Sequence, residues 1–222
     1  MPDPRALIFD LDGTLVDTVG TRIEAWLHTF AEADIPADRG HVAGLIGADG
    51  KRLAREVAQA AGRTLGEVEG EAIDRRAGEI YGELNTDPQP LPGVRELLLA
   101  LDDARFTWAI ATSSRAEQVL ASVEALRLPR RPHITDGSDV EHAKPAPDLL
   151  LHSAHELGLP PADCWYVGDA VWDVLAARAA EMPVIAVPTG SASAEQLTAA
   201  GAAAVTTFDG VFGELRRRRA LK

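Results

Sequence analysis

Short apolar runs, each followed by polar residues, recur along the chain outside residues 18–86. The first run, Ala6–Phe9, has the length of one buried strand. Segments with helical periodicity separate these runs. Repeated alternation of strand and helix is typical of α/β proteins, so we expect a doubly wound, Rossmann-like parallel sheet. The other predicted strands are at residues 106–111, His133–Thr135, 164–167, 184–187 and 204–206.

The helices between these strands are predicted from apolar residues three and four positions apart. Pro92 and Gly93 open the first of them, at residues 94–101. Ser113 or Ser114 is expected to cap the helix that follows the second strand. The remaining predicted helices are at residues 149–157, 173–180, 195–200 and 211–219.

Residues 18–86 show helical periodicity and no strand pattern. Helices are predicted at residues 21–33, 51–61 and 64–84, with Val68, Ile73 and Ile80 as core candidates in the last. A glycine-spaced loop, residues 44–50, separates the first two. We therefore expect an all-helical insert at residues 18–86 within a catalytic core made of residues 1–17 and 87–222.

Polar residues follow four of the predicted strands. These are Asp10 and Asp12 after the first, Thr112 and Ser113 after the second, Lys144 after the third, and Asp169 and Asp173 after the fourth. The carboxyl ends of parallel strands face one edge of a sheet, so these side chains are expected to share one space. Carboxylates that lie close together repel each other unless a cation compensates, and Mg²⁺ prefers such oxygen ligands.

An edge of this composition suits phosphoryl transfer. A cation and a lysine can neutralise phosphate oxygens, hydroxyl and backbone N–H groups can donate hydrogen bonds, and one carboxylate can attack phosphorus. Taken singly, each residue has an ordinary structural explanation as a helix cap, a solvated lysine or an acid in a turn. Their conjunction in this order favours a catalytic site.

The string from Asp10 to Asp17, Asp-Leu-Asp-Gly-Thr-Leu-Val-Asp, closely resembles the first motif of the haloacid dehalogenase-like hydrolase superfamily, in its phosphatase branch. The order and spacing of the other strand-end groups match the remaining motifs across residues 6–187, outside the insert. The chain is similar to phosphoglycolate phosphatase-like and beta-phosphoglucomutase-like members, which implies that the insert is a helical cap.

By this resemblance, Asp10 is the nucleophile that forms an aspartyl-phosphate. Asp12 protonates the leaving oxygen and then deprotonates the water that hydrolyses the intermediate. Thr112 would hold the transferring phosphoryl group, and Lys144 would pair with Asp10 and with phosphate.

The resemblance also implies a magnesium site. Its expected ligands are Asp10, the carbonyl oxygen of Asp12, Asp169, and Asp173 directly, through water or from outside the ligand shell. Two positions depart from the usual pattern, because Ala143 stands where glycine commonly precedes the lysine and Ala170 where serine often follows Gly-Asp. Neither replaces a side chain assigned to chemistry.

The implied activity is that of a phosphoric monoester hydrolase acting on a small phosphorylated metabolite. A sugar-phosphate mutase stays open, since it uses the same aspartyl-phosphate and returns the phosphoryl group to its substrate. A 2-haloacid dehalogenase is a further alternative, although dehalogenases typically lack an acid at the position of Asp12. A phosphate-binding or partner-binding protein without activity is opposed by the intact acid set, because buried acids are costly.

Substrate selectivity is expected to reside in the insert, which can cover the site and contact the leaving group. Gly47 and Lys51, in and after the glycine-spaced loop, are candidate substrate residues together with Ser113. The alternative is that the loop only connects two helices and that Lys51 and Arg55 are solvated.

The amino-acid composition limits the classes of binding partner and the cellular compartment that we expect. The 222-residue chain has a formal net charge of −12, which opposes nonspecific binding to nucleic acid. The four consecutive arginines at 216–219 are expected to be a solvated helix end. The single cysteine, Cys164, is expected to be a small buried hydrophobe. No apolar run has membrane-spanning length and no signal segment precedes the first strand, so we expect a cytoplasmic protein, with a monomer as the default.

Overall fold

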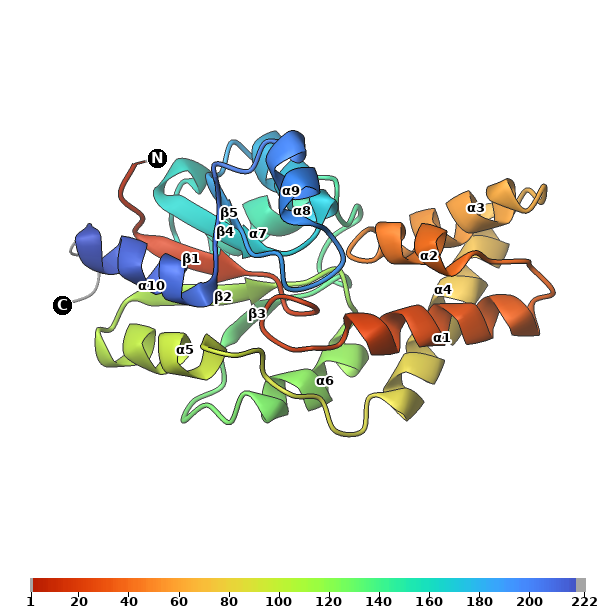
Figure 1. The fold of residues 1–222 in the computed structure, drawn as a ribbon, viewed down its shortest axis with the longest axis horizontal. Helices are drawn as coiled ribbons and strands as arrows, with labels where there is room; N and C mark the ends of the chain where they lie inside the picture. The colour runs from red at the N-terminus through yellow and green to blue at the C-terminus, as the bar shows by residue number, and fades with distance from the viewer. Residues whose placement is uncertain (1, 219–222) are drawn as a thin grey trace.

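The computed structural model describes residues 2–218, and a parallel sheet lies at the centre of this part of the chain (Figure 1). Its strands are ordered β3-β2-β1-β4-β5-β6, and all neighbouring pairs are parallel. The strands are β1 (Ala6–Phe9), β2 (Thr107–Ala111), β3 (His133–Thr135), β4 (Cys164–Gly168), β5 (Val184–Ala186) and β6 (Ala204–Val205). The predicted fold class is confirmed.

Helices cover both faces of the sheet. They are α5 (Val94–Asp103), α6 (Ala116–Ala125), α7 (Asp148–Glu156), η1 (Pro161–Asp163), α8 (Val171–Ala179), α9 (Ala194–Ala200) and α10 (Phe208–Arg217). Successive strand residues point to opposite faces, so Leu7 and Phe9 of β1 pack in one apolar cluster with α5 and α10. Ala6 and Ile8 pack in a second cluster with α7 and α8. All four are fully buried, as a central parallel strand requires.

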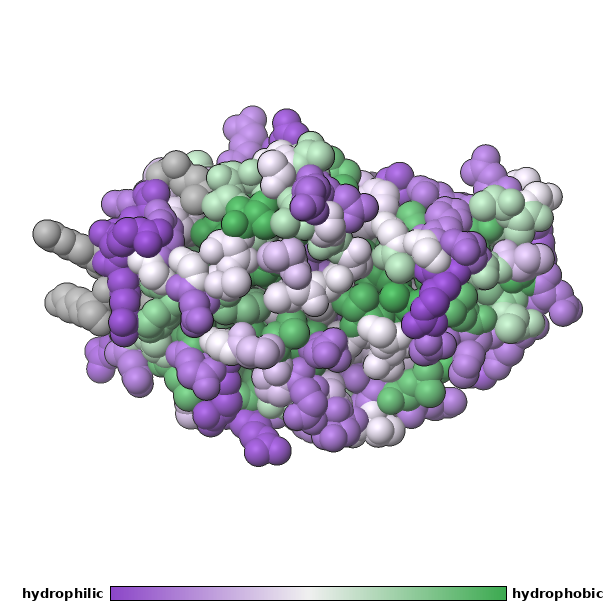
Figure 2. Space-filling view, viewed as in Figure 1, coloured by the Kyte–Doolittle hydropathy of each residue, from purple (hydrophilic) through white to green (hydrophobic). Residues whose placement is uncertain are grey.

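Between β1 and α5 the chain forms helices only. These are α1 (Val19–Glu32), α2 (Arg39–Leu45), α3 (Gly50–Ala60) and α4 (Glu67–Leu84). They share an apolar cluster of their own, in which Trp26 stacks on Phe30 at a ring distance of 5.5 Å. Figure 1 shows them beside the sheet rather than on either of its faces. On the face drawn in Figure 2, hydrophobic residues gather near the junction of the two parts.

Several local predictions need correction. Val68 is 85% exposed and not in the core, because α4 begins at Glu67 and turns this side chain outward. Gly44 belongs to α2, a helix that was not predicted, so the glycine-spaced loop is shorter. Neither Ser113 nor Ser114 caps α6, whose cap residue is Arg115 without a side-chain bond.

Other predictions concern the ends and the surface of the chain. The last helix ends at Arg217, and Arg219 of the predicted arginine run lies outside the described residues. Cys164 is free and buried as expected, and burial raises the pKa of its thiol to about 11. Within residues 2–218, none of the helices combines the length and the apolar character that a membrane span demands.

Candidate active site

The site lies where the strand order reverses. The chain runs outward from β1 through β2 to β3 and then crosses back to β4, on the other side of β1. Ligands of open α/β sheets bind at the carboxyl ends of the strands at such a point. Asp10 directly follows β1, and its backbone N–H donates to the carbonyl of Val167 in β4 at 2.8 Å. Asp169 directly follows β4, so the sheet itself brings the two acids together.

Three buried carboxylates form a cluster at this edge. Oxygen atoms of Asp10, Asp169 and Asp173 all lie within 4.8 Å of one another. Lys144 Nζ donates to Asp10 Oδ1 at 2.5 Å and to Asp173 Oδ1 at 2.7 Å. Tyr166 OH donates to Asp173 Oδ1 at 3.2 Å. One ammonium group therefore faces three carboxylates.

The electrostatics of the cluster reflect this imbalance. Burial raises the pKa of Asp10 well above its usual value, although Lys144 opposes the change. Burial, followed by the charge of Asp173, raises the pKa of Asp169 to about 7. Burial alone would lower the pKa of Lys144, but Asp10 and Asp173 raise it, so the lysine stays charged. A set of hard oxygen donors with excess negative charge fits a divalent cation.

Two loops close around Asp169. Thr14 Oγ1 donates to Asp169 Oδ1 at 2.8 Å, and the backbone N–H of Ser191 donates to Oδ2 at 3.0 Å. Gly13 has a left-handed φ of 79°, and a Cβ there would lie 2.6 Å from Asp169 Oδ2. A side chain at Gly190 would also collide with this carboxylate. Both glycines are needed for the loops to approach this closely.

Asp173 is held by the first turn of α8. The backbone N–H of Ala170 donates to Asp173 Oδ2 at 2.9 Å, and Oδ1 receives Lys144. This backbone bond does not depend on the side chain at 170, so alanine there leaves Asp173 in position.

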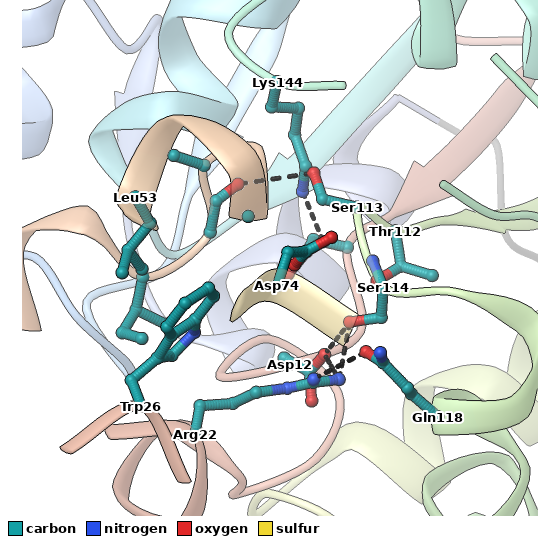
Figure 3. A pocket seen from close by; sticks show the side chains of 15 residues that line it. Asp12, Arg22, Trp26, Leu53, Asp74, Thr112, Ser113, Ser114, Gln118 and Lys144 are labelled. Carbon is teal, nitrogen blue, oxygen red and sulfur yellow. Dashed lines mark hydrogen bonds and ion pairs between the residues drawn. The ribbon is translucent and has the colours of Figure 1, made fainter. Parts of the chain in front are cut away.

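Asp12 points into a different set of partners. Its Oδ1 accepts from Thr18 Oγ1 at 2.6 Å and from Tyr81 OH at 3.1 Å, and its Oδ2 accepts from Arg22 Nη2 at 2.8 Å and Ser114 Oγ at 2.7 Å. Figure 3 shows the contacts of Asp12 with Arg22 and Ser114. Burial by itself would raise the pKa of Asp12, but Arg22 and the hydrogen bonds lower it. Asp12 is therefore ionised in this arrangement, and its side chain is not part of the three-carboxylate cluster.

Arg22 is bound on several sides. Its Nη1 donates to Gln118 Oε1 at 2.9 Å, and its guanidinium lies 3.4 Å from the ring centroid of Tyr81. Sequence reasoning did not identify Arg22 or Tyr81. A signal existed for Arg22, because it lies four residues before Trp26 and so carries a charge onto the buried face of α1.

The loop after β2 supplies the hydroxyl groups. Thr112 is buried and lines the pocket, and its Oγ1 accepts from the backbone N–H of Ser114 at 3.2 Å. Ser113 Oγ donates to the carbonyl of Gly47 at 3.4 Å, which links this loop to the helical segment.

Residues 18–86 are docked on the sheet edge around the cluster. Besides the Ser113 bond, the backbone N–H of Asp49 donates to the carbonyl of Lys144 at 2.8 Å. Trp172 Nε1, in α8, donates to the carbonyl of Gly44 at 3.0 Å. Next to these contacts lies a partly open cavity of about 60 Å³ whose lining comes from both parts of the molecule.

The structure brings most of the predicted site residues to this cavity. Asp10, Asp12, Thr112, Ser113, Lys144 and Gly47 line it, and Asp169 and Asp173 lie beside Asp10. Lys51 does not line it. Its ammonium lies 3.8 Å from Glu71 on α4, and its surroundings are a separate surface pocket, because its position in α3 points it toward that helix. We therefore do not retain Lys51 as a substrate residue.

Comparison with known proteins adds to this geometry. A family model described as haloacid dehalogenase-like hydrolase matches residues 7–187. The chain is 28% identical to a phosphoglycolate phosphatase of Mesorhizobium japonicum, over 96% of the chain and 95% of that protein. It is 30% identical to a beta-phosphoglucomutase of Bacillus subtilis, over 84% of each. The crystal structure of a hydrolase from Pseudomonas syringae superposes with a TM-score of 0.86 and 32% identity, over 91% of the chain and 93% of that chain.

Proposed function

Since the chain belongs to the haloacid dehalogenase-like hydrolase family, we propose that it is a Mg²⁺-dependent phosphatase of a small phosphorylated metabolite. The proposal rests mainly on the observation that two neighbouring carboxylates, those of Asp10 and Asp12, lie in different environments. Asp10 lies in the acid cluster against Lys144, whereas Asp12 lies outside it and is ionised by Arg22. Two acids one residue apart, held differently, suit a nucleophile and a proton-transfer group.

In the proposed reaction, an Asp10 oxygen attacks phosphorus while the bond from phosphorus to the leaving oxygen breaks. Lys144 and Thr112, which line the cavity, are the groups available to bind the phosphoryl oxygens. Asp12 donates a proton to the leaving oxygen. It must be protonated for this step, and the negative charge of the bound phosphoryl group raises its pKa.

Hydrolysis of the aspartyl-phosphate is the second step. Asp12, ionised again after its proton has left with the product, accepts a proton from the attacking water. Arg22, Thr18 and Ser114 favour this ionised form by their charge and hydrogen bonds. The bond between Asp10 and phosphorus breaks, and inorganic phosphate is released.

Mg²⁺ would be held by the carboxylates of Asp10, Asp169 and Asp173 and by the carbonyl oxygen of Asp12, and when bound it supplies positive charge that stabilises the transferring phosphoryl group. We propose that residues 18–86 form a cap domain over a core of residues 1–17 and 87–222. The cap excludes water while the leaving group is protonated. A cytoplasmic location is part of the proposal.

Release of inorganic phosphate from a panel of phosphorylated metabolites tests the proposal. Turnover is expected with Mg²⁺, to stop with EDTA and to return when Mg²⁺ is added. Asp10→Asn should abolish it, and Asp209→Asn, at an exposed acid of α10, should not. Full activity after exhaustive chelation, or in Asp10→Asn, would contradict the proposed mechanism.

A further inference from the structure

One of the residues that line the cavity is Asp74, an acidic residue of the cap. Asp74 extends from α4 into the lining, between Trp26 and Leu53 on one side and residues 112–114 on the other (Figure 3). Its side chain is only 18% exposed. The other cap residues of the lining, apart from Arg22, are apolar side chains and glycines: Trp26, Ile46, Gly47, Ala48, Gly50 and Leu53.

Neighbouring residues hold the side chain of Asp74 in its position. Arg115 Nη2, from the core, donates to Asp74 Oδ2 at 3.0 Å and to Glu71 Oε1 at 2.5 Å. Gly50, the first residue of α3, gives the carboxylate room, because any side chain there would collide with it. Burial raises the pKa of Asp74 although Arg115 opposes this, so its carboxylate is poorly solvated. A poorly solvated carboxylate favours hydrogen-bond donors and strongly disfavours a second anion.

The cationic side chains that line the cavity are already engaged. Within residues 2–218, Arg22 and Lys144 are the cations of the lining. Arg22 is bound to Asp12, and Lys144 is bound to Asp10 and Asp173. In the proposed reaction, both act near the phosphoryl group, where Arg22 keeps Asp12 ionised and Lys144 binds phosphoryl oxygens. A leaving group with its own negative charge would therefore approach Asp74 without an unengaged cation in the lining to receive it, because Arg115 lies outside the lining and is bonded to both Asp74 and Glu71.

We infer that the substrate is a phosphate monoester whose leaving group is uncharged and bears hydroxyl groups, and that Asp74 rejects leaving groups carrying a carboxylate or a second phosphate. The inference rests on the proposed phosphatase reaction. Asp74 can accept hydrogen bonds from hydroxyl groups, whereas glycolate would place a carboxylate in the same cavity. A mutase must hold a phosphoryl group at each end of its bisphosphate, and the cap end offers the second one an acid. The site thus favours hydrolysis of a monophosphate.

Two substrates that differ in one group test this. 2-Hydroxyethyl phosphate and phosphoglycolate share a two-carbon leaving group and differ in a terminal hydroxymethyl or carboxylate. The wild type should show a kcat/KM at least about 10-fold higher for 2-hydroxyethyl phosphate. Asp74→Asn should raise kcat/KM for phosphoglycolate by about 10-fold or more, and change that for 2-hydroxyethyl phosphate less than about threefold.

Glu71→Gln is the matched control. Glu71 also bonds to Arg115, but it is 39% exposed and does not line the cavity, so this variant should keep the wild-type ratio. The inference would be overturned by a wild type that prefers phosphoglycolate, or by an Asp74→Asn variant whose kcat/KM changes equally for both substrates. Either result would leave the proposed phosphatase function standing. The wild-type ratio decides the matter even if Asp74→Asn does not fold. If neither substrate nor p-nitrophenyl phosphate is hydrolysed with Mg²⁺, the proposed function fails and the inference fails with it.

Discussion

The sheet edge and the proposed helical cap, residues 18–86, position their site residues in different ways. At the edge, Asp10 and Asp169 directly follow adjacent strands, so the backbone ladder fixes where their side chains lie. In the cap, Arg22 and Asp74 reach the cavity from helix faces, and their positions depend on how α1 and α4 pack. In the proposed reaction, the edge carries the groups that handle phosphate, and the cap carries the groups that meet the rest of the substrate. The two parts should therefore respond differently to substitution.

The largest difference is expected between two lysines. Lys144→Met removes the ammonium that bonds to both Asp10 and Asp173, so turnover should vanish and the free energy of unfolding should fall by about 3–5 kcal/mol. Lys51→Met, in the cap, removes a half-exposed lysine that pairs only loosely with Glu71. It should change stability by less than about 0.5 kcal/mol. Urea unfolding and phosphate release measure both variants, and equal losses would break the distinction between edge and cap.

Asp12→Asn should have the next largest effect. The amide cannot carry out the two proton transfers, so kcat should fall by about 10²–10⁴-fold. With p-nitrophenyl phosphate, whose leaving group needs no proton, the aspartyl-phosphate should accumulate in this variant, because its hydrolysis needs the base. Steady-state phosphate release measures the loss, with Asp17→Asn at an exposed acid of the same motif as the control. A kcat within threefold of the wild type would remove Asp12 from proton transfer.

Arg22→Gln tests whether a cap residue tunes the edge. Arg22 lowers the pKa of Asp12, so its removal should raise that pKa and move the acidic limb of the pH–rate profile to higher pH. Hydrolysis of the aspartyl-phosphate needs Asp12 in its ionised form, so where this step limits kcat, a shift of one pH unit would reduce kcat about 10-fold on that limb while sparing the plateau. Arg22→Lys keeps a positive charge near Asp12, so its acidic limb should lie between those of the wild type and Arg22→Gln.

Arg39→Gln is the control for Arg22, since Arg39 is an exposed arginine of the cap that pairs with Glu24, away from Asp12. An acidic limb that does not move in Arg22→Gln, or moves equally in Arg39→Gln, would contradict the role given to Arg22.

The smallest effect concerns stability without metal. The pKa of Asp169 is about 7 in the folded protein and about 3.9 in the unfolded chain, so the folded state retains a proton that the unfolded state loses. Stability from this group is present below about pH 4 and is lost as pH rises to about 7. In EDTA, Asp169→Asn should therefore raise Tm above that of the wild type at pH 8, by about 2–4 °C per kcal/mol, and change it little at pH 4.

Thermal denaturation with and without Mg²⁺ completes that comparison. Mg²⁺ should raise the Tm of the wild type at pH 8 and not that of Asp169→Asn. Asp163→Asn, at a partly exposed acid before β4, should behave as the wild type. If the Asp169→Asn variant were less stable than the wild type in EDTA at pH 8, the ionised carboxylate of Asp169 would not be destabilising the folded protein.

The sequence predicted the edge well because strand ends are easy to locate. A four-residue apolar run followed by Asp10 leaves little freedom for where that acid lies, and the same holds for Asp169 after β4. The parallel order of the strands could likewise be expected from the alternation of strands and helices.

The cap was harder to predict because helical periodicity gives a face but not the partner of that face. Val68 was expected in the core, yet it lies on the outward side of the first turn of α4. Lys51 was weighed as a substrate residue because it follows a glycine-spaced loop, but the packing of α3 against α4 turns it toward Glu71. Asp74 left no sequence signal, since an acid on a mostly polar helix usually faces solvent.

The central claim is that Asp10 becomes covalently phosphorylated. Borohydride reduces an aspartyl-phosphate to homoserine, so the most direct measurement is peptide mass spectrometry after borohydride is added during turnover of p-nitrophenyl phosphate with Mg²⁺. Asp12→Asn, in which the intermediate should persist, increases the signal. Homoserine is expected at position 10 and to be absent when Mg²⁺ is omitted. Turnover with homoserine at another acid, or with none at position 10 in either protein, would contradict the mechanism.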